Sequence, residues 1–78
     1  MHALPDDDDW LTNRQHILGA RVRSARVQQN LTQEQLHLAA EISRDTLQSI
    51  EAGRGNPTLA TLLRLAHVMG VPVTHLLE

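Results

Sequence analysis

The sequence predicts an all-α domain, a compact arrangement of five short helices without strands. Apolar residues recur at steps of three and four along most of the chain, which is the spacing of one face of a helix. Ser or Thr stands before most of these runs, where its hydroxyl can cap the free amides of a helix start, and Gly or Asn stands after them. The core must be aliphatic, because the only aromatic residue is Trp10.

Residues 1–10 are predicted to form a flexible acidic tail, and residues 11–78 to form the domain. A proline and four consecutive acids near the N-terminus leave no helical pattern there. The alternative is an acidic arm that folds over a basic face or touches a partner. Trp10 is expected to cover the edge of the core, with a dimer contact as the alternative.

The first helix is expected from about Asn13 to Gln29. Thr12 and Gln15 have the spacing of a capping box, in which a hydroxyl caps the third helical amide and the glutamine side chain returns to the cap residue. Asn30 should end the helix, since Asn tolerates a left-handed backbone. The apolar stripe of this helix comprises Ile17, Leu18, Val22, Ala25 and Val27.

Two short helices are predicted within residues 31–53. Thr32 and Gln35 again form a capping-box pattern, so the first of the two begins at about Gln33. Ser43 is a good cap for the second. The apolar stripe of the first comprises Leu36, Ala39 and Ala40.

The second of these helices, at about residues 43–52, should expose a polar edge. Only Leu47 and Ile50 are large and apolar in it, so one edge is buried. The other positions carry the side chains that hydrogen-bond base edges in a major groove of DNA. These exposed residues are Arg44, Asp45, Gln48 and Ser49.

A loop at residues 54–57 should lead to a fourth helix, capped by Thr58 and ended by Gly70. The predicted buried face of this helix comprises Leu59, Leu62, Leu63, Ala66 and Met69, widened by Leu65. Pro72 opens a short fifth helix. The apolar side of the fifth helix comprises Val73, Leu76 and Leu77.

Residues 31–53 resemble the helix-turn-helix of the lambda-repressor-like, Cro-type family, which includes the xenobiotic-response-element-type transcriptional regulators. The similarity continues on both sides of this stretch. The segments that carry it are Ile17-Leu18-Gly19, Arg54-Gly55-Asn56-Pro57-Thr58-Leu59, Leu62-Leu63-Arg64-Leu65-Ala66, Gly70-Val71 and Leu76-Leu77. The resemblance implies a five-helix fold in which residues 43–52 enter the major groove of double-stranded DNA.

The resemblance also implies residue roles. The base-contacting positions of the family fall on Arg44, Asp45, Gln48 and Ser49. Phosphate contacts are expected from Gln33, Ser43, Arg54 and Asn56. Arg26 is expected to form a structural ion pair with Glu51, which ends the recognition helix.

Three residues depart from the family pattern. His37 replaces the usual Ala at a close approach of two helices, so it must widen their crossing or turn its ring toward solvent. Glu41 replaces a Gly in the turn, where a left-handed backbone costs about 1 kcal/mol relative to Gly. Pro72 replaces Ser or Thr, so the last helix lacks a cap hydroxyl and should fray.

The formal charge of −2 conceals a basic domain. Asp6 to Asp9 supply four of the nine acids, and from Leu11 onward seven Arg oppose five acids, a net charge of +2. An Arg fork suits bidentate contact with phosphate or guanine. The excess predicts a limited phosphate footprint for each subunit.

Enzyme chemistry is not expected. The five His lack the spacing of a helical zinc pair, there is no Cys, and no glycine-rich loop precedes a helix. We therefore expect no catalytic, metal, cofactor or small-molecule site. The sequence contains no signal pattern and no apolar run of about 18 residues, so we expect a cytoplasmic protein without a membrane span.

These observations predict a repressor-like, sequence-specific DNA-binding transcriptional regulator that binds a palindromic operator as a homodimer. Candidate residues for the dimer surface are Trp10, Val73 and Leu77. The alternative is a protein-interaction adaptor that keeps the fold without binding DNA, which Glu41, Asp45 and the acidic tail favour. The sequence leaves open the operator and the choice among a phage-type repressor, a restriction-modification controller and an antitoxin.

Overall fold

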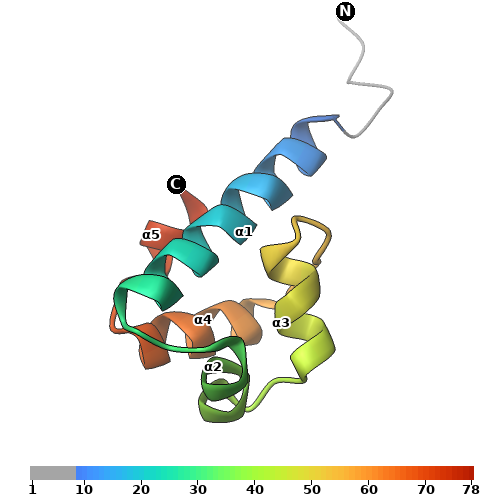
Figure 1. Cartoon of the computed structure of the whole chain (residues 1–78). Coiled ribbons are helices and arrows are strands. Elements are labelled where there is room, and N and C mark those ends of the chain that lie inside the picture. The colour runs from blue at the N-terminus through green and yellow to red at the C-terminus, as the bar shows by residue number, and fades with distance from the viewer. Residues whose placement is uncertain (1–8) are drawn as a thin grey trace, which may run out of the picture.

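Five α-helices make up the part of the chain that the computed structural model describes, residues 9–78, and this part contains no strand. Figure 1 shows their arrangement. The helices are α1 (Asp9–Gln28), α2 (Gln33–Ala40), α3 (Arg44–Glu51), α4 (Leu59–Met69) and α5 (Val73–Leu77). The predicted all-α class and the predicted number of helices are both confirmed.

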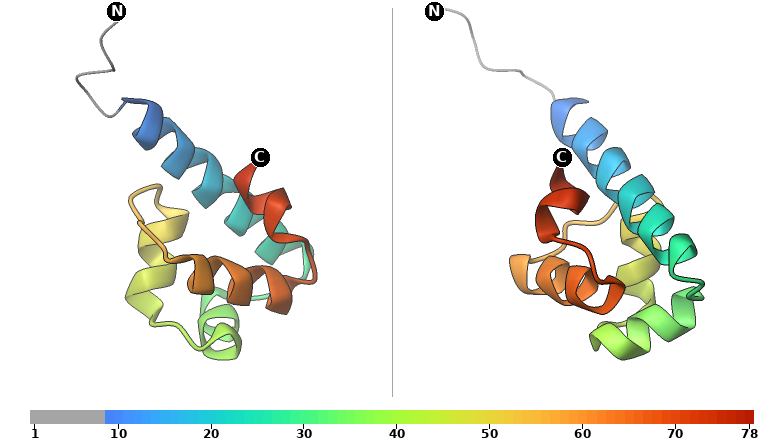
Figure 2. Two further views of the ribbon diagram at one scale, coloured as in Figure 1. Left: turned by 180° about the vertical axis from the view of Figure 1, so that it is seen from behind. Right: turned by 90° about the vertical axis from the view of Figure 1, so that its left-hand side faces the viewer.

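The longest helix, α1, lies between α3 and α5, which occupy opposite sides of the domain (Figures 1 and 2). α2 packs against both α3 and α4, and α5 packs against α1 and α4. The N-terminal end of α1 projects beyond the other helices (Figure 1). One side of the domain therefore presents α3, while α5 belongs to the other side.

The core is aliphatic, as predicted. Its largest fully buried side chains come from all five helices and are Val22, Leu36, Leu47, Ile50, Leu65, Met69 and Leu76. Burial of each such side chain contributes about 1.5–3 kcal/mol relative to exposure. No polar or charged residue is fully buried within residues 9–78, so the helices are held mainly by apolar packing.

The predicted start of the first helix is wrong, because α1 begins at Asp9 and not at Asn13. Thr12 lies inside the helix, and Gln15 does not form the predicted capping box. The acidic side chain of Asp9 suits the positive end of a helix, which favours the earlier start. Asp9 and Trp10 thus belong to α1, and the rest of the predicted tail lies outside the described residues.

Trp10 does not cover the core edge, since it is 58% exposed on the projecting end of α1. Several residues predicted to face the core are also exposed. They are Val27, Ala39, Leu59 and Leu63. On α4 the buried face is centred nearer Leu65 than we predicted, so the helix is rotated and Leu59 and Leu63 fall at its solvent edge.

The left-handed positions agree with the sequence prediction. Asn30 ends α1 at φ 57°, and Glu41 follows α2 at φ 59°. The backbone N–H of Glu41 donates to the carbonyl groups of His37 and Leu38, which closes the end of α2. Glu41 therefore holds a glycine-like conformation at the turn between α2 and α3.

His37 and Pro72 show how the other two departures are accommodated. The half-buried His37 ring places Nδ1 3.1 Å from the carbonyl oxygen of Ile42. The ring thus bridges the turn, instead of pointing freely into solvent as one of our alternatives held. Pro72 forms no side-chain cap hydrogen bond, as predicted, and α5 spans only five residues.

Replacement of Glu41 by Gly should raise the free energy of unfolding by about 1 kcal/mol, because Gly adopts a left-handed backbone without the Cβ cost. Chemical denaturation measures this change. The matched control is Ala39→Gly, at an exposed helical position of the same helix, which should lower stability by about 1 kcal/mol. Destabilisation by both substitutions would show that the left-handed backbone of Glu41 is not strained.

Candidate nucleic-acid interface

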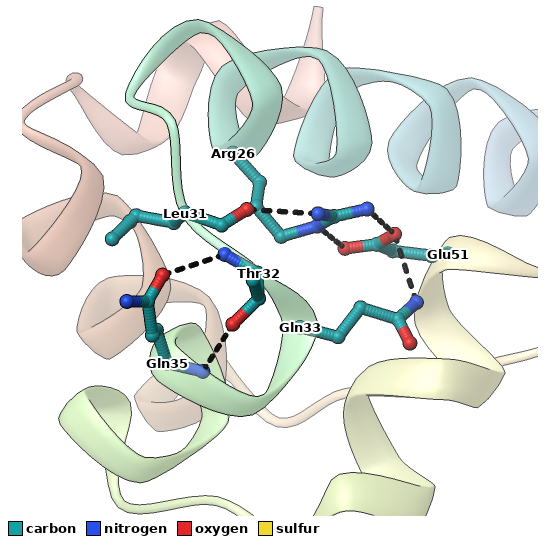
Figure 3. Close-up of polar contacts among 6 residues, drawn as sticks. All are labelled: Arg26, Leu31, Thr32, Gln33, Gln35 and Glu51. Atoms are coloured by element: carbon teal, nitrogen blue, oxygen red, sulfur yellow. Dashed lines mark hydrogen bonds and ion pairs between the residues drawn. The ribbon is translucent and has the colours of Figure 1, made fainter.

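The start of α2 is fixed by the predicted capping box (Figure 3). The backbone N–H of Gln35 donates to Thr32 Oγ1 at 3.0 Å, and the side-chain Oε1 of Gln35 accepts from the Thr32 N–H at 2.9 Å. Two amides that would otherwise be free at the helix start are satisfied in this way. Gln33, the first residue of α2, is therefore held at a defined position.

Ser43 fixes the start of α3. Its Oγ accepts a hydrogen bond from the Thr46 N–H at 3.0 Å and donates to Thr46 Oγ1 at 2.7 Å. The hydroxyl hydrogen is thus used within the cap. A phosphate contact by the Ser43 side chain, as predicted from the resemblance, would require this hydroxyl to change partner.

α3 separates an apolar edge from a polar one. Leu47 and Ile50 are fully buried against the rest of the core. The four predicted base-contacting residues share the opposite side of the helix, and the last of them is partly buried. They are Arg44, Asp45, Gln48 and Ser49. The structure therefore brings the predicted reading residues together on one accessible edge.

The predicted Arg26–Glu51 ion pair is present and is bidentate (Figure 3). Arg26 Nε lies 2.8 Å from Glu51 Oε2, and Arg26 Nη2 lies 3.0 Å from Glu51 Oε1. Arg26 Nη1 also donates to the carbonyl oxygen of Leu31 at 2.9 Å. The side chains are 13% and 5% exposed, so the pair lies almost wholly inside the domain.

The ion pair affects the pKa of Arg26. The hydrogen bonding of Arg26 to Glu51, in which the guanidinium donates, raises the pKa of Arg26; burial lowers this pKa, and the negative charge of Glu51 raises it further. Arg26 therefore remains a cation in the folded protein. A charged guanidinium in a nearly buried position requires its carboxylate partner.

Gln33 extends this network to α2. Its Nε2 donates to Glu51 Oε1 at 3.1 Å (Figure 3). This bond uses one of the two amide hydrogens, so the second can still reach an external oxygen. The predicted phosphate-contacting glutamine is thus positioned by the residue that ends α3.

The loop after α3 is held from α1 by Gln15, a role that we did not predict. Gln15 Nε2 donates to the Gly55 carbonyl and to Asn56 Oδ1, both at 3.0 Å. Because the Asn56 oxygen is the acceptor, its NH₂ group is left to donate elsewhere. The loop arginine, Arg54, is exposed. We did not predict this long-range contact because Gln15 follows Thr12 at the spacing of a capping box, and we assigned its side chain to that role.

Two shallow grooves flank α3. The groove on the loop side is lined by residues that include Asp45, Ser49, Arg54 and Asn56. The groove on the α1 and α2 side is lined by Arg23, Arg26, Gln33, Gln48, Glu51 and Ala52. Three of the predicted phosphate-contacting residues, Gln33, Arg54 and Asn56, therefore border the same face as the predicted reading edge. Arg23, which lies in the second groove, was not among the predicted site residues.

Comparison with known proteins identifies the family that the sequence resembles. The sequence profile of the helix-turn-helix family matches residues 22–76. The control protein C.SmaI of Serratia marcescens is 38% identical over 74 residues, which cover 95% of this chain and 88% of C.SmaI. The chain belongs to the helix-turn-helix family.

Two further similarities support this membership. The immunity repressor protein of Bacillus phage phi105 is 40% identical over 57 residues, which cover 73% of this chain but only 40% of the repressor. The crystal structure of the restriction-modification controller protein C.AhdI from Aeromonas hydrophila matches with a TM-score of 0.76 and 27% sequence identity. That match covers 80% of this chain and 94% of C.AhdI. The helix-turn-helix is of the Cro/C1 type. The chain is therefore one of the repressor-like DNA-binding regulators.

The three predicted dimer residues of this helix-turn-helix protein differ in accessibility. Val73 packs against the domain's own core, whereas Leu77 is 44% exposed, and Trp10 lies on the projecting end of α1. Leu77 borders an apolar groove of about 180 Å³ that also includes Leu11 and Leu62. Leu77 is therefore better placed than Val73 for a contact with another molecule.

Two features are absent from the described part of the helix-turn-helix protein, residues 9–78. In this range no group of three or more His, Cys, Asp or Glu side chains is arranged to hold a metal ion. None of its helices is both long enough and apolar enough to cross a membrane.

Substitution of Glu51 by Ala should lower the free energy of unfolding by about 3 kcal/mol, because it leaves the Arg26 guanidinium nearly buried and unpaired. The double variant Arg26→Met/Glu51→Leu should come within about 1 kcal/mol of wild type. Urea denaturation compares them. Glu34→Ala, which removes an exposed acid from α2, is the control and should change stability by about 0.5 kcal/mol or less. A double variant whose loss equals the sum of its single variants would mean that the two side chains are not coupled.

Proposed function

We propose that this protein is a sequence-specific transcriptional repressor that inserts α3 into the major groove of double-stranded DNA. The observation that carries the proposal is the polar edge of α3, where Arg44, Asp45, Gln48 and Ser49 are gathered opposite the buried Leu47 and Ile50. An α-helix fits the major groove, in which each base pair presents a distinct pattern of donors and acceptors. Polar side chains on the exposed edge of such a helix are suited to read that pattern.

Each reading residue has a chemical preference. The Arg44 fork can donate two hydrogen bonds to guanine O6 and N7, and the Gln48 amide can bind adenine N6 and N7. The two residues lie one helical turn apart on α3, so they would contact neighbouring base pairs. Both side chains are exposed, and within residues 9–78 neither forms a side-chain hydrogen bond or ion pair.

The backbone of the DNA would be held from both sides of α3. Gln33 and Ser43 stand at the starts of α2 and α3, and Arg54 and Asn56 stand in the loop before α4. Helix starts favour anions because their free amides and their dipoles attract negative charge. Such contacts fix the register of the protein on the duplex, while the base contacts supply selectivity.

We further propose that the protein binds a palindromic operator as a homodimer. A single α3 of eight residues reads about half of a site, and two copies related by a twofold axis would double the contact. Exposed Leu77 and its apolar groove provide a self-association surface on α5. Leu59 and Leu63, one turn apart on the neighbouring α4, add exposed apolar area.

The similarities to C.SmaI, to C.AhdI and to the phi105 immunity repressor support a regulatory role. C.AhdI is named a restriction-modification controller protein, C.SmaI a control protein, and the phi105 protein an immunity repressor. We propose control of transcription as the role of this protein.

Arg44→Ala should weaken binding to the preferred DNA site by about 1–3 kcal/mol and relax the preference at one base pair, because the guanine contact is lost. Competitive binding titrations against a set of single-base-pair variants measure both effects. Arg21→Ala removes an Arg of α1 that forms no side-chain hydrogen bond or ion pair within residues 9–78, and serves as the control. Equal losses on preferred and on random DNA after the Arg44 substitution would contradict base reading.

Selection of binding sites from a random duplex library, followed by footprinting, should yield a palindrome with half-sites one or more helical turns apart. Sedimentation of the protein–DNA complex should show two chains for each site. Leu77→Arg should weaken binding to the full palindrome while leaving binding to an isolated half-site unchanged. A single protein chain that protects one non-palindromic site with nanomolar affinity would contradict the dimer, and protein that binds no duplex at low salt would favour the adaptor.

A further inference from the structure

Asp45 occupies the most outward position of α3. The buried Leu47 and Ile50 define the inward side of the helix. At about 100° of rotation for each residue, Asp45 lies roughly opposite the middle of that pair. Its side chain is exposed in the first turn of α3. A duplex that approaches the exposed edge of α3 therefore meets the Asp45 carboxylate at the centre of that edge.

This carboxylate is not neutralised by the domain. Within residues 9–78, Asp45 forms no ion pair and no side-chain hydrogen bond. Arg44 is its neighbour in sequence, and Arg54 lines the same groove, yet neither lies within ion-pairing distance of it. The negative charge would thus face the phosphates of any bound DNA.

We infer that Asp45 makes α3 selective by rejecting DNA sites whose amino donor lies on the strand that its carboxylate does not reach, an inference that rests on the proposed DNA-binding function. In the major groove only cytosine N4 and adenine N6 present such donors. At a base pair with one of these groups in reach, the carboxylate gains a charge-assisted hydrogen bond. At any other sequence it gains none, and the repulsion from the phosphates remains. Selectivity then comes from a penalty on wrong sites as well as from attraction to right ones.

The helix itself gives a second reason for an acid at this position. A carboxylate in the first turn interacts favourably with the positive end of a helix. That effect would stabilise α3 without any effect on DNA. The two effects predict opposite changes in DNA affinity when the Asp45 charge is removed. Loss of helix stability cannot strengthen DNA binding, whereas loss of the proposed rejection should strengthen it.

Asp45→Asn is the test, since it removes the charge while it keeps the size of the side chain. The affinity for random-sequence duplex at low salt should rise by about threefold to tenfold, because one repulsive charge is lost near the phosphates. The rise should shrink as salt screens the charge. Site selection with Asp45→Ala, whose side chain forms no hydrogen bond, should lose the requirement for cytosine or adenine on one particular strand at one base pair of each half-site.

Glu78→Gln is the matched control. It removes the same charge from an exposed residue beside α5, on the side of the domain opposite α3 (Figure 2). Its affinity for random duplex should stay within about twofold of wild type, because the removed charge lies on the side of the domain away from the reading edge and repulsion weakens with distance. Thermal unfolding of each variant checks that it is folded at the temperature of the titrations.

The possible outcomes distinguish failure of the proposed Asp45 role from failure of the proposed DNA-binding function. Wild-type protein that binds DNA, together with an Asp45→Asn variant that binds random duplex no more tightly, would overturn the role of Asp45 alone. An equal rise for Glu78→Gln would also overturn it, since net charge would then explain the effect. Wild-type protein that binds no duplex would overturn the proposed function and this inference together.

Discussion

Arg26 and Glu51 form a bidentate ion pair at the place where α1, α2 and α3 meet, and Gln33 joins the same carboxylate (Figure 3). Such a pair adds little net stability, but it tolerates only one geometry, because either partner alone would be a nearly buried charge. A second contact acts nearby. A Cβ on Gly19 would overlap the carbonyl oxygen of Ile50, so only glycine lets the backbone of α1 approach α3 this closely. The C-terminal end of α3 is thus fixed, while the side chains proposed to read bases lie along the exposed edge of the same helix.

A helix with a fixed end and an exposed polar edge is suited to the DNA reading that we propose for α3. Binding loses less free energy when the reading side chains are already positioned, because fewer groups must be ordered on contact. The loop after α3 is held in the same way by Gln15, through Gly55 and Asn56. Two of the residues proposed to hold phosphates are therefore anchored, Asn56 to α1 and Gln33 to the ion pair. The domain works as a rigid frame for one short helix.

The sequence predicted the local features of this frame well and the long-range ones less well. The caps of α2 and α3 depend on residues within one turn, so their spacing was sufficient. The left-handed backbone of Glu41 was expected from the family resemblance. The Arg26–Glu51 pair came from the family resemblance. The rotation of α4 and the role of Gln15 depend on contacts between distant segments, which no local pattern encodes. The start of α1 was missed because a capping-box spacing at Thr12 outweighed the weaker signal of Asp9.

The central claim is that α3 and its anchored flanks form the DNA-binding face. Amide chemical-shift mapping by NMR, with the full chain titrated by its selected duplex, tests this claim most directly. The account predicts the largest shifts at residues 43–49, with further shifts at Gln33 and residues 54–56. A homodimer would add shifts in α5, but these should also appear on self-association without DNA. Shifts that are confined to α4 and α5, with α3 unchanged, would contradict the account.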